Sequence, residues 1–69
     1  MSYPVDDLAK QTQSAVNAMI RQECLNQSWR LWRKIAESVI EREIGTDWDY
    51  LTVQSYSSPP EVILTQYRA

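Results

Sequence analysis

The strongest constraint on the fold is a long helical region whose apolar side changes halfway along it. No glycine or proline occurs between Val5 and Ile44, so no residue there breaks a helix. At about 100° per residue, the apolar residues of the two halves fall on nearly opposite sides. The first group is Val5, Leu8, Ala9, Ala15, Val16, Met19 and Ile20, and the second is Leu25, Trp29, Leu31, Trp32, Ile35, Ala36, Val39, Ile40 and Ile44. The chain therefore either turns back near residues 25–28 or buries its two halves against different partners.

A turn in this region is the favoured interpretation. Asn26 and Ser28 are typical of turns and helix caps. An unbroken helix of about 40 residues would be roughly 60 Å long, whereas a compact chain of this size has a radius of gyration of about 11 Å. We therefore predict helices over residues 4–24 and 28–44, the second ended by Gly45. One continuous helix is the alternative, and it would nearly require a dimer.

The remaining residues change in composition and predict a β-hairpin. Residues 50–56 alternate between apolar and polar side chains, and residues 62–67 are rich in β-branched and aromatic types. The segment Ser57–Pro60 between them suits a hairpin loop. We thus expect an α+β fold in a single domain over residues 1–69, with the hairpin over about 49–67. The alternative is an all-α fold with short helices after Thr46 and Ser58, because residues 58–61 also read as a helix-capping box.

Composition limits the class of protein. A chain of 69 residues buries a small core, so we expect a second chain or a larger protein to supplement its stability. One cysteine excludes an internal disulfide and fits a reducing compartment. The start, MSYPVDD, lacks the features of a signal peptide, and the longest apolar runs, such as Val62–Leu64, span three residues. We predict a cytoplasmic protein with no membrane span.

The residue types needed for catalysis are scarce. The chain has no histidine and one glycine, so the commonest general base and the glycine-rich phosphate loops are missing. The carboxylates over residues 37–49 lack the spacing of a calcium loop and are interpreted as solvated charge. Cys24 is interpreted as a small buried hydrophobe, and a redox role would need a lowered pKa for which only Arg21 is a plausible helper. We therefore predict no enzymatic activity, no metal and no cofactor.

The most distinctive local string is the Trp- and Arg-rich segment 28–34. Tryptophans among basic residues can bind nucleic acid by base stacking and phosphate contacts, and the residues that would do so are Trp29, Arg30, Arg33 and Lys34. However, Trp29 and Trp32 share the helix face of Ala36 and Ile40, so both are expected in the core. The net charge of −2 also argues against nucleic acid. Nucleic-acid binding is therefore the alternative function.

The preferred function is that of a small non-catalytic adaptor or regulatory subunit that binds protein. Trp48, Tyr50 and Tyr56 lie outside the helical core pattern and are the candidate exposed anchors, together with Arg33, which borders the tryptophan face. The alternative for the three aromatic residues is that they cover the helices as part of the core. Residues 21–34 are mostly basic and residues 37–49 mostly acidic. Two antiparallel copies would place opposite charges together, which predicts a homodimer that weakens as salt rises.

Overall fold

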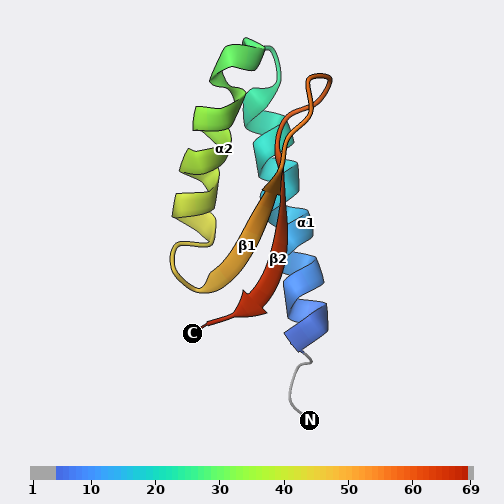
Figure 1. Cartoon of the computed structure of the whole chain (residues 1–69), viewed down its shortest axis with the longest axis vertical. Helices are drawn as coiled ribbons and strands as arrows, with labels where there is room; N and C mark the ends of the chain where they lie inside the picture. The colour runs from blue at the N-terminus through green and yellow to red at the C-terminus, as the bar shows by residue number, and fades with distance from the viewer. Residues whose placement is uncertain (1–4, 69) are drawn as a thin grey trace.

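Two helices followed by an antiparallel β-hairpin make up the fold, which confirms the α+β prediction. A computed structural model describes residues 5–68 (Figure 1). The elements are α1 (Val5–Cys24), α2 (Trp29–Glu43), β1 (Trp48–Val53) and β2 (Glu61–Tyr67). The helix therefore breaks where it was expected to break, and the segment after Gly45 forms strands rather than short helices. Pro4, the expected first helical residue, lies outside the described residues.

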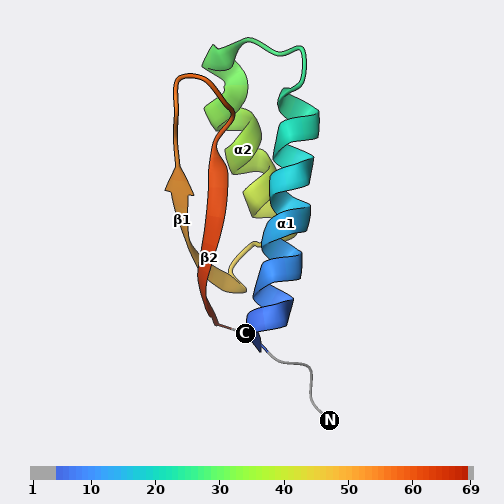
Figure 2. The ribbon, with the colours of Figure 1, turned by 90° about the vertical axis from the view of Figure 1, so that its right-hand side faces the viewer.

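The reversal between the helices follows from two residues with turn chemistry. Asn26 has a positive φ of 65°, a left-handed conformation that asparagine adopts more readily than most residues. Ser28 then caps α2, since its hydroxyl accepts a hydrogen bond of 3.3 Å from the backbone N–H of Arg30. As a result, α1 and α2 run antiparallel and side by side (Figures 1 and 2). An ion pair of 2.6 Å from Arg42 to Glu23 joins the two helices.

Gly45 ends α2 in the left-handed conformation, with a φ of +56°. A Cβ placed there would meet nothing closer than the backbone oxygen of Glu41 at 3.7 Å, so space does not forbid a side chain. We expect Gly45→Ala to lower the free energy of unfolding by about 1–2 kcal/mol, because alanine is strained at positive φ. Urea unfolding measures this loss. Gly45→Asn is the control and should lose less; equal losses would contradict a conformational cause.

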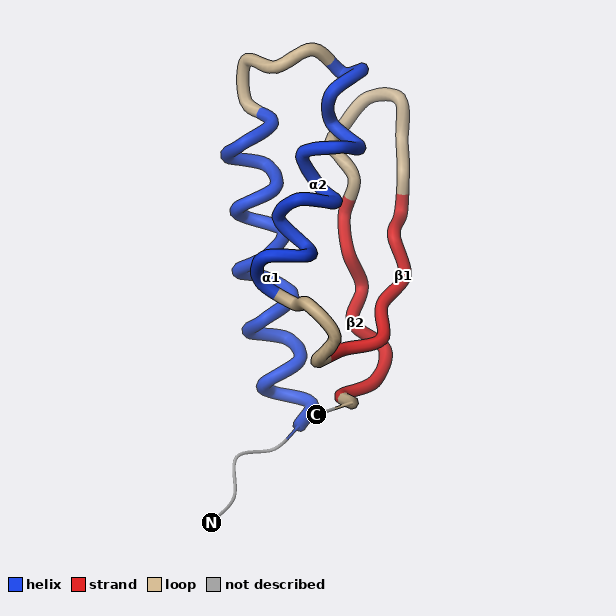
Figure 3. The backbone as a smooth tube through the Cα atoms, turned by 90° about the vertical axis from the view of Figure 1, so that its left-hand side faces the viewer, coloured by secondary structure: helices blue, strands red, loops and turns tan. Residues whose placement is uncertain are grey.

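The hairpin has one irregularity and two distinct faces. Residues pair from Val53 with Glu61 down to Trp48 with Tyr67, and the register shifts between Asp49 and Tyr50. The inner face, directed at the helices, carries Tyr50 and Thr52 from β1 and Val62 and Leu64 from β2. The outer face carries Leu51, Val53 and Ile63, which are exposed. β2 lies between the helices and β1 (Figure 3).

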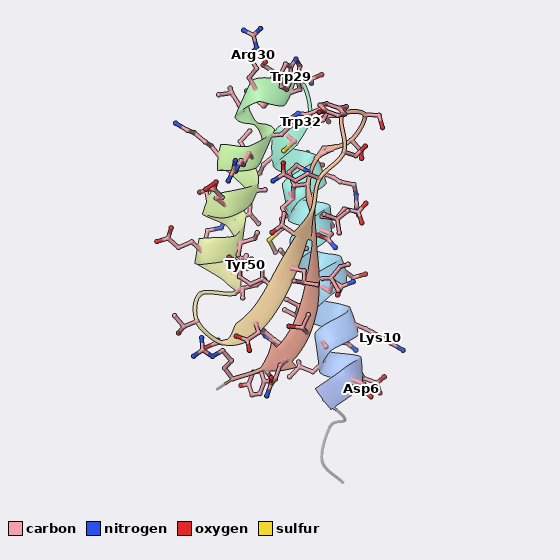
Figure 4. The ribbon with its side chains drawn as sticks, viewed as in Figure 1. Asp6, Lys10, Trp29, Arg30, Trp32 and Tyr50 are labelled. Carbon is pink, nitrogen blue, oxygen red and sulfur yellow. The ribbon has the colours of Figure 1, made fainter. Side chains whose placement is uncertain are left out.

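All four elements contribute to one core. Its buried residues are Val16, Ile20, Cys24, Ala36, Val39, Ile40, Ile44, Trp48, Val62 and Leu64. The expectation that Trp29 joins this core is wrong, because Trp29 is exposed. Leu25 and Leu31, which belong to the same apolar stripe of the sequence, are exposed as well. The first turn of α2 lies at the end of the molecule, beyond the part of α1 that could cover it (Figure 4). The sequence stripe therefore predicts the buried face of α2 only from Trp32 onward.

Two amide side chains of α1 attach this helix to the outer edge of β2. Asn17, which is buried, donates to the backbone oxygen of Val62 at 3.0 Å and accepts from the backbone N–H of Val62 at 2.8 Å. Gln13 accepts from the backbone N–H of Leu64 at 3.0 Å. These side chains replace the hydrogen bonds that a neighbouring strand would make, so the edge of β2 is satisfied without one.

Candidate functional site

A pocket of about 400 Å³ opens between the first turn of α2 and the loop that joins β1 to β2. We call it the tip pocket, because both segments lie at the same end of the molecule (Figures 1 and 4). It is lined by Trp29, Arg30, Trp32, Arg33, Gln54, Ser55, Tyr56 and Pro60. Segments more than twenty residues apart in the sequence therefore build one aromatic and basic surface.

The helix start positions the aromatic and basic side chains of the tip pocket. The Arg30 guanidinium lies 5.5 Å from the centre of the Trp29 ring, which is cation–π distance. Arg33, one turn further, forms an exposed ion pair of 3.5 Å with Glu37. Trp32 forms the inner wall, and its indole N–H is buried with no hydrogen-bond partner among the described residues. The described residues that line the pocket include no carboxylate, so its electrostatic character is basic.

The four residues proposed from the sequence as protein-binding anchors differ in their exposure and in the part of the molecule where they lie. Tyr56 is fully exposed in the hairpin loop and, with Arg33, lines the tip pocket. Tyr50 is half-exposed beside α2. The expectation that Trp48 is exposed is wrong: it is 7% exposed and packs edge-on against Tyr67, with ring centroids 4.7 Å apart. Trp48 opens β1 directly after the turn that follows buried Ile44, so it closes the core instead.

Three of the four residues named for nucleic-acid binding come together. Trp29, Arg30 and Arg33 line the tip pocket, whereas Lys34 and Glu23 line a separate shallow hollow between the helices. Sequence reasoning missed the part that Gln54, Ser55 and Pro60 contribute to the pocket. No local signal identifies those residues, because only the hairpin brings their loop to the start of α2.

A second hollow, of about 340 Å³, continues from the tip pocket between α2 and β1. The two share Arg33, Gln54 and Pro60. Below them, Ala36 and Ile40 of α2 face Tyr50 and Thr52 of β1, with Glu37 at the rim. We call this hollow the α2–β1 groove. The groove follows the inner face of β1, which carries Tyr50 and Thr52.

Cys24 is enclosed by the core, with 3% of its surface exposed. Burial raises the pKa of its thiol, and the negative charge of neighbouring Glu23 raises it further. Both effects disfavour the thiolate, which is the reactive form. The surroundings of this thiol therefore differ from the reactive microenvironment that a redox role would require.

We expect Cys24 in the folded chain to react with an aromatic disulfide reagent at least roughly 100-fold more slowly than in the urea-unfolded chain, because reaction requires local opening. The raised pKa also sets a pH dependence. Stability gained from the neutral thiol is complete below the unfolded pKa and declines as pH rises through the folded value. Stopped-flow absorbance measures the rates; equal rates in folded and unfolded chains would contradict the burial of this thiol.

No family model, curated protein or solved structure matches this chain, so the site is interpreted from its own geometry. Within residues 5–68, neither helix combines the length and apolarity needed to cross a membrane. The same residues contain no cluster of three or more histidine, cysteine or carboxylate side chains able to hold a metal ion.

Proposed function

We propose that the chain is a small non-catalytic protein-binding protein, an adaptor or regulatory subunit that contacts its partner through the tip pocket. The observation that carries this proposal is the exposure of two large aromatic side chains beside two arginines. Trp29 is 64% exposed and Tyr56 fully so, and Arg30 and Arg33 line the same pocket. Tryptophan, tyrosine and arginine are the residues that contribute most binding energy at protein interfaces.

The basic character of the pocket defines the chemistry of the partner. A segment with a carboxylate next to an apolar or aromatic side chain would pair with Arg30 or Arg33 and pack on Trp29. Arg33 is held near Glu37 only by an exposed ion pair, which is weak and exchanges readily for a partner's carboxylate. The partner of the proposed function is therefore an acidic, apolar segment of another protein.

Selection from a random peptide library tests this proposal, because such a library samples acidic, basic and apolar segments alike. Peptides that combine acidic and aromatic residues should be enriched on the immobilised chain. Their affinity, measured by calorimetry, should fall about 30-fold for Trp29→Ala, the loss expected of an interface hot spot. Gln11→Ala, on the exposed side of α1, is the matched control and should leave affinity unchanged. Equal binding to wild type and Trp29→Ala would overturn the proposal, as would the absence of enrichment.

Nucleic-acid binding through Trp29, Arg30 and Arg33 is the second candidate. It gains support from one observation, namely that the Trp29 indole is largely exposed, as stacking on a base requires. The position of Lys34 outside the tip pocket and the net charge of −2 weigh against it. A mobility-shift assay with a single-stranded oligonucleotide at about 50 mM salt separates the two functions. A shift lost in Trp29→Ala would replace the protein-binding proposal, and no shift would remove nucleic acid.

The proposal includes a location in the cytoplasm and assembly of the chain as a homodimer. The single, buried Cys24 suits a reducing compartment. A sheet of only two strands is marginal on its own, and a second copy is a direct way to extend it.

A further inference from the structure

The two edges of the hairpin differ in their hydrogen bonding to the rest of the molecule. The outer edge of β2 is occupied, because Asn17 bonds both backbone groups of Val62 and Gln13 bonds the N–H of Leu64. Within residues 5–68, no comparable side chain covers β1. Among the described residues, the hydrogen bonds formed outside the helices and the hairpin ladder do not involve the backbone of Tyr50 or Thr52.

The register determines which backbone groups β1 presents at its open edge. Residues opposite each other in an antiparallel pair alternate between positions that bond to each other and positions that do not. Val62 and Leu64 direct their N–H groups to α1, so their partners Thr52 and Tyr50 occupy non-bonded positions. The N–H and C=O groups of Tyr50 and Thr52 consequently point away from β2. They form a row ready to accept another strand.

The usual protection of an open edge is missing from β1. Proteins guard such edges with proline, lysine or a bulge, but residues 48–53 contain neither proline nor lysine. The extra residue of the bulge belongs to β2. Leu51 and Val53 are 60% and 50% exposed on the outer face, and the only charge near them in the strand, Asp49, is paired with Arg68. An edge without this protection readily pairs with another strand.

We propose that β1 pairs antiparallel with β1 of a second copy, giving a four-stranded sheet in the order β2–β1–β1–β2. This inference rests on the proposed self-association and adds the surface and the register; it does not depend on the tip pocket. With the two-fold axis at Thr52, Leu51 lies opposite the partner's Val53 and Tyr50 opposite the partner's Gln54. Shifting the axis to Leu51 or Tyr50 would instead oppose Asp49 to an apolar residue, which is unfavourable across a strand pair.

Closure of the sheet favours a second copy over a foreign strand. Each described hairpin has one open edge, and α1 covers the other through Asn17 and Gln13. In a pair of copies, each β1 therefore supplies hydrogen-bond partners for the open edge of the other, and the dimer is closed. A foreign strand would leave its own far edge open. The same axis makes α2 of the two copies antiparallel on the inner face. Basic and acidic ends of α2 then alternate, in agreement with the charge asymmetry of the sequence.

Light scattering combined with amide hydrogen exchange of the full chain tests the pairing in the unaltered protein. A dimer is expected, with the amides of Tyr50 and Thr52 protected at high concentration and released on dilution, while those of Leu51 and Val53, which face β2, stay protected. A monomer at about 1 mM, the weakest affinity worth assigning to such an interface, would overturn the inference and leave the tip-pocket function standing. A dimer whose Tyr50 and Thr52 amides exchange freely would overturn the edge pairing alone.

A matched pair of outer-face variants locates the interface. Leu51→Lys should raise the dimer dissociation constant at least about tenfold, because each copy places a charge opposite the partner's Val53. Ile63→Lys, exposed on the same face but on β2, should change it far less. Circular dichroism confirms that both fold, which their exposed positions favour. Equal effects of the two substitutions would overturn the proposal.

A spin label on Thr52→Cys tests the register. Cys24 is buried and is not labelled in the folded chain. Since the axis passes through position 52, the two labels of the dimer should show strong dipolar broadening, and a label on Gln11→Cys should not. A dimer without broadening at position 52 would overturn the register.

Discussion

Replacing Ile20 by alanine should lower the free energy of unfolding by about 3–4 kcal/mol, the largest loss expected from one core truncation here. Ile20 lies in α1 and is fully buried in the core. Truncation removes apolar contacts and leaves a cavity that the short helices close only in part. A domain of this size has a total stability of about 3–10 kcal/mol, so the variant should be close to unfolding.

Urea unfolding followed by circular dichroism measures this effect. Leu25→Ala is the matched control, because Leu25 is apolar and lies near the end of the same helical region, but is 62% exposed. Its loss should stay within about 0.5 kcal/mol. A loss below about 1 kcal/mol for Ile20→Ala would mean that α1 does not pack in this arrangement.

Replacing Asn17 by leucine should cost about 2–5 kcal/mol, although the change makes the helix more apolar. Leucine leaves the N–H and C=O of Val62 without the partners that Asn17 supplies at 2.8 and 3.0 Å. Each buried backbone group without a partner costs about 1–3 kcal/mol. The substitution also uncovers the outer edge of β2, so we expect the variant to associate beyond the dimer.

Thermal unfolding and light scattering of Asn17→Leu check both consequences. Gln11→Leu introduces the same side chain on the exposed side of α1 and should change stability by less than about 0.5 kcal/mol. If Asn17→Leu were as stable as wild type, the edge of β2 would not depend on this amide. In that case the asymmetry between the two sheet edges, on which the proposed dimer rests, would lose its foundation.

The reversal near Asn26 and the hairpin could be predicted because both arise from local chemistry. Asn26 tolerates the left-handed conformation and Ser28 caps α2. The switch of the apolar stripe excludes a straight amphipathic helix. The β-branched residues after Pro60 favour strands over the helical alternative. Each of these signals lies within a few residues of the element it predicts.

The exposure of Trp29 and the burial of Trp48 could not be predicted in the same way. Trp29 continues the apolar stripe of α2 yet is exposed, because that stripe extends past the end of the elements that cover it. Trp48 lies outside the helical pattern yet is buried, because the turn at Gly45 directs β1 back along α2. Burial depends on what lies opposite a residue, and periodicity describes only the element that carries it.

The amino-acid sequence by itself determined the number and order of the elements, the position of the turn and the inward-facing residues in the middle of each helix. These depend on backbone preferences and on periodicities of a few residues. Only the tertiary structure decided which aromatic residues remain at the surface, that Asn17 substitutes for a strand along β2, and that β1 keeps an open edge. The two hydrogen bonds of Asn17 join residues 45 positions apart. The energies of all these features come from contacts that do not exist until the hairpin lies on the helices.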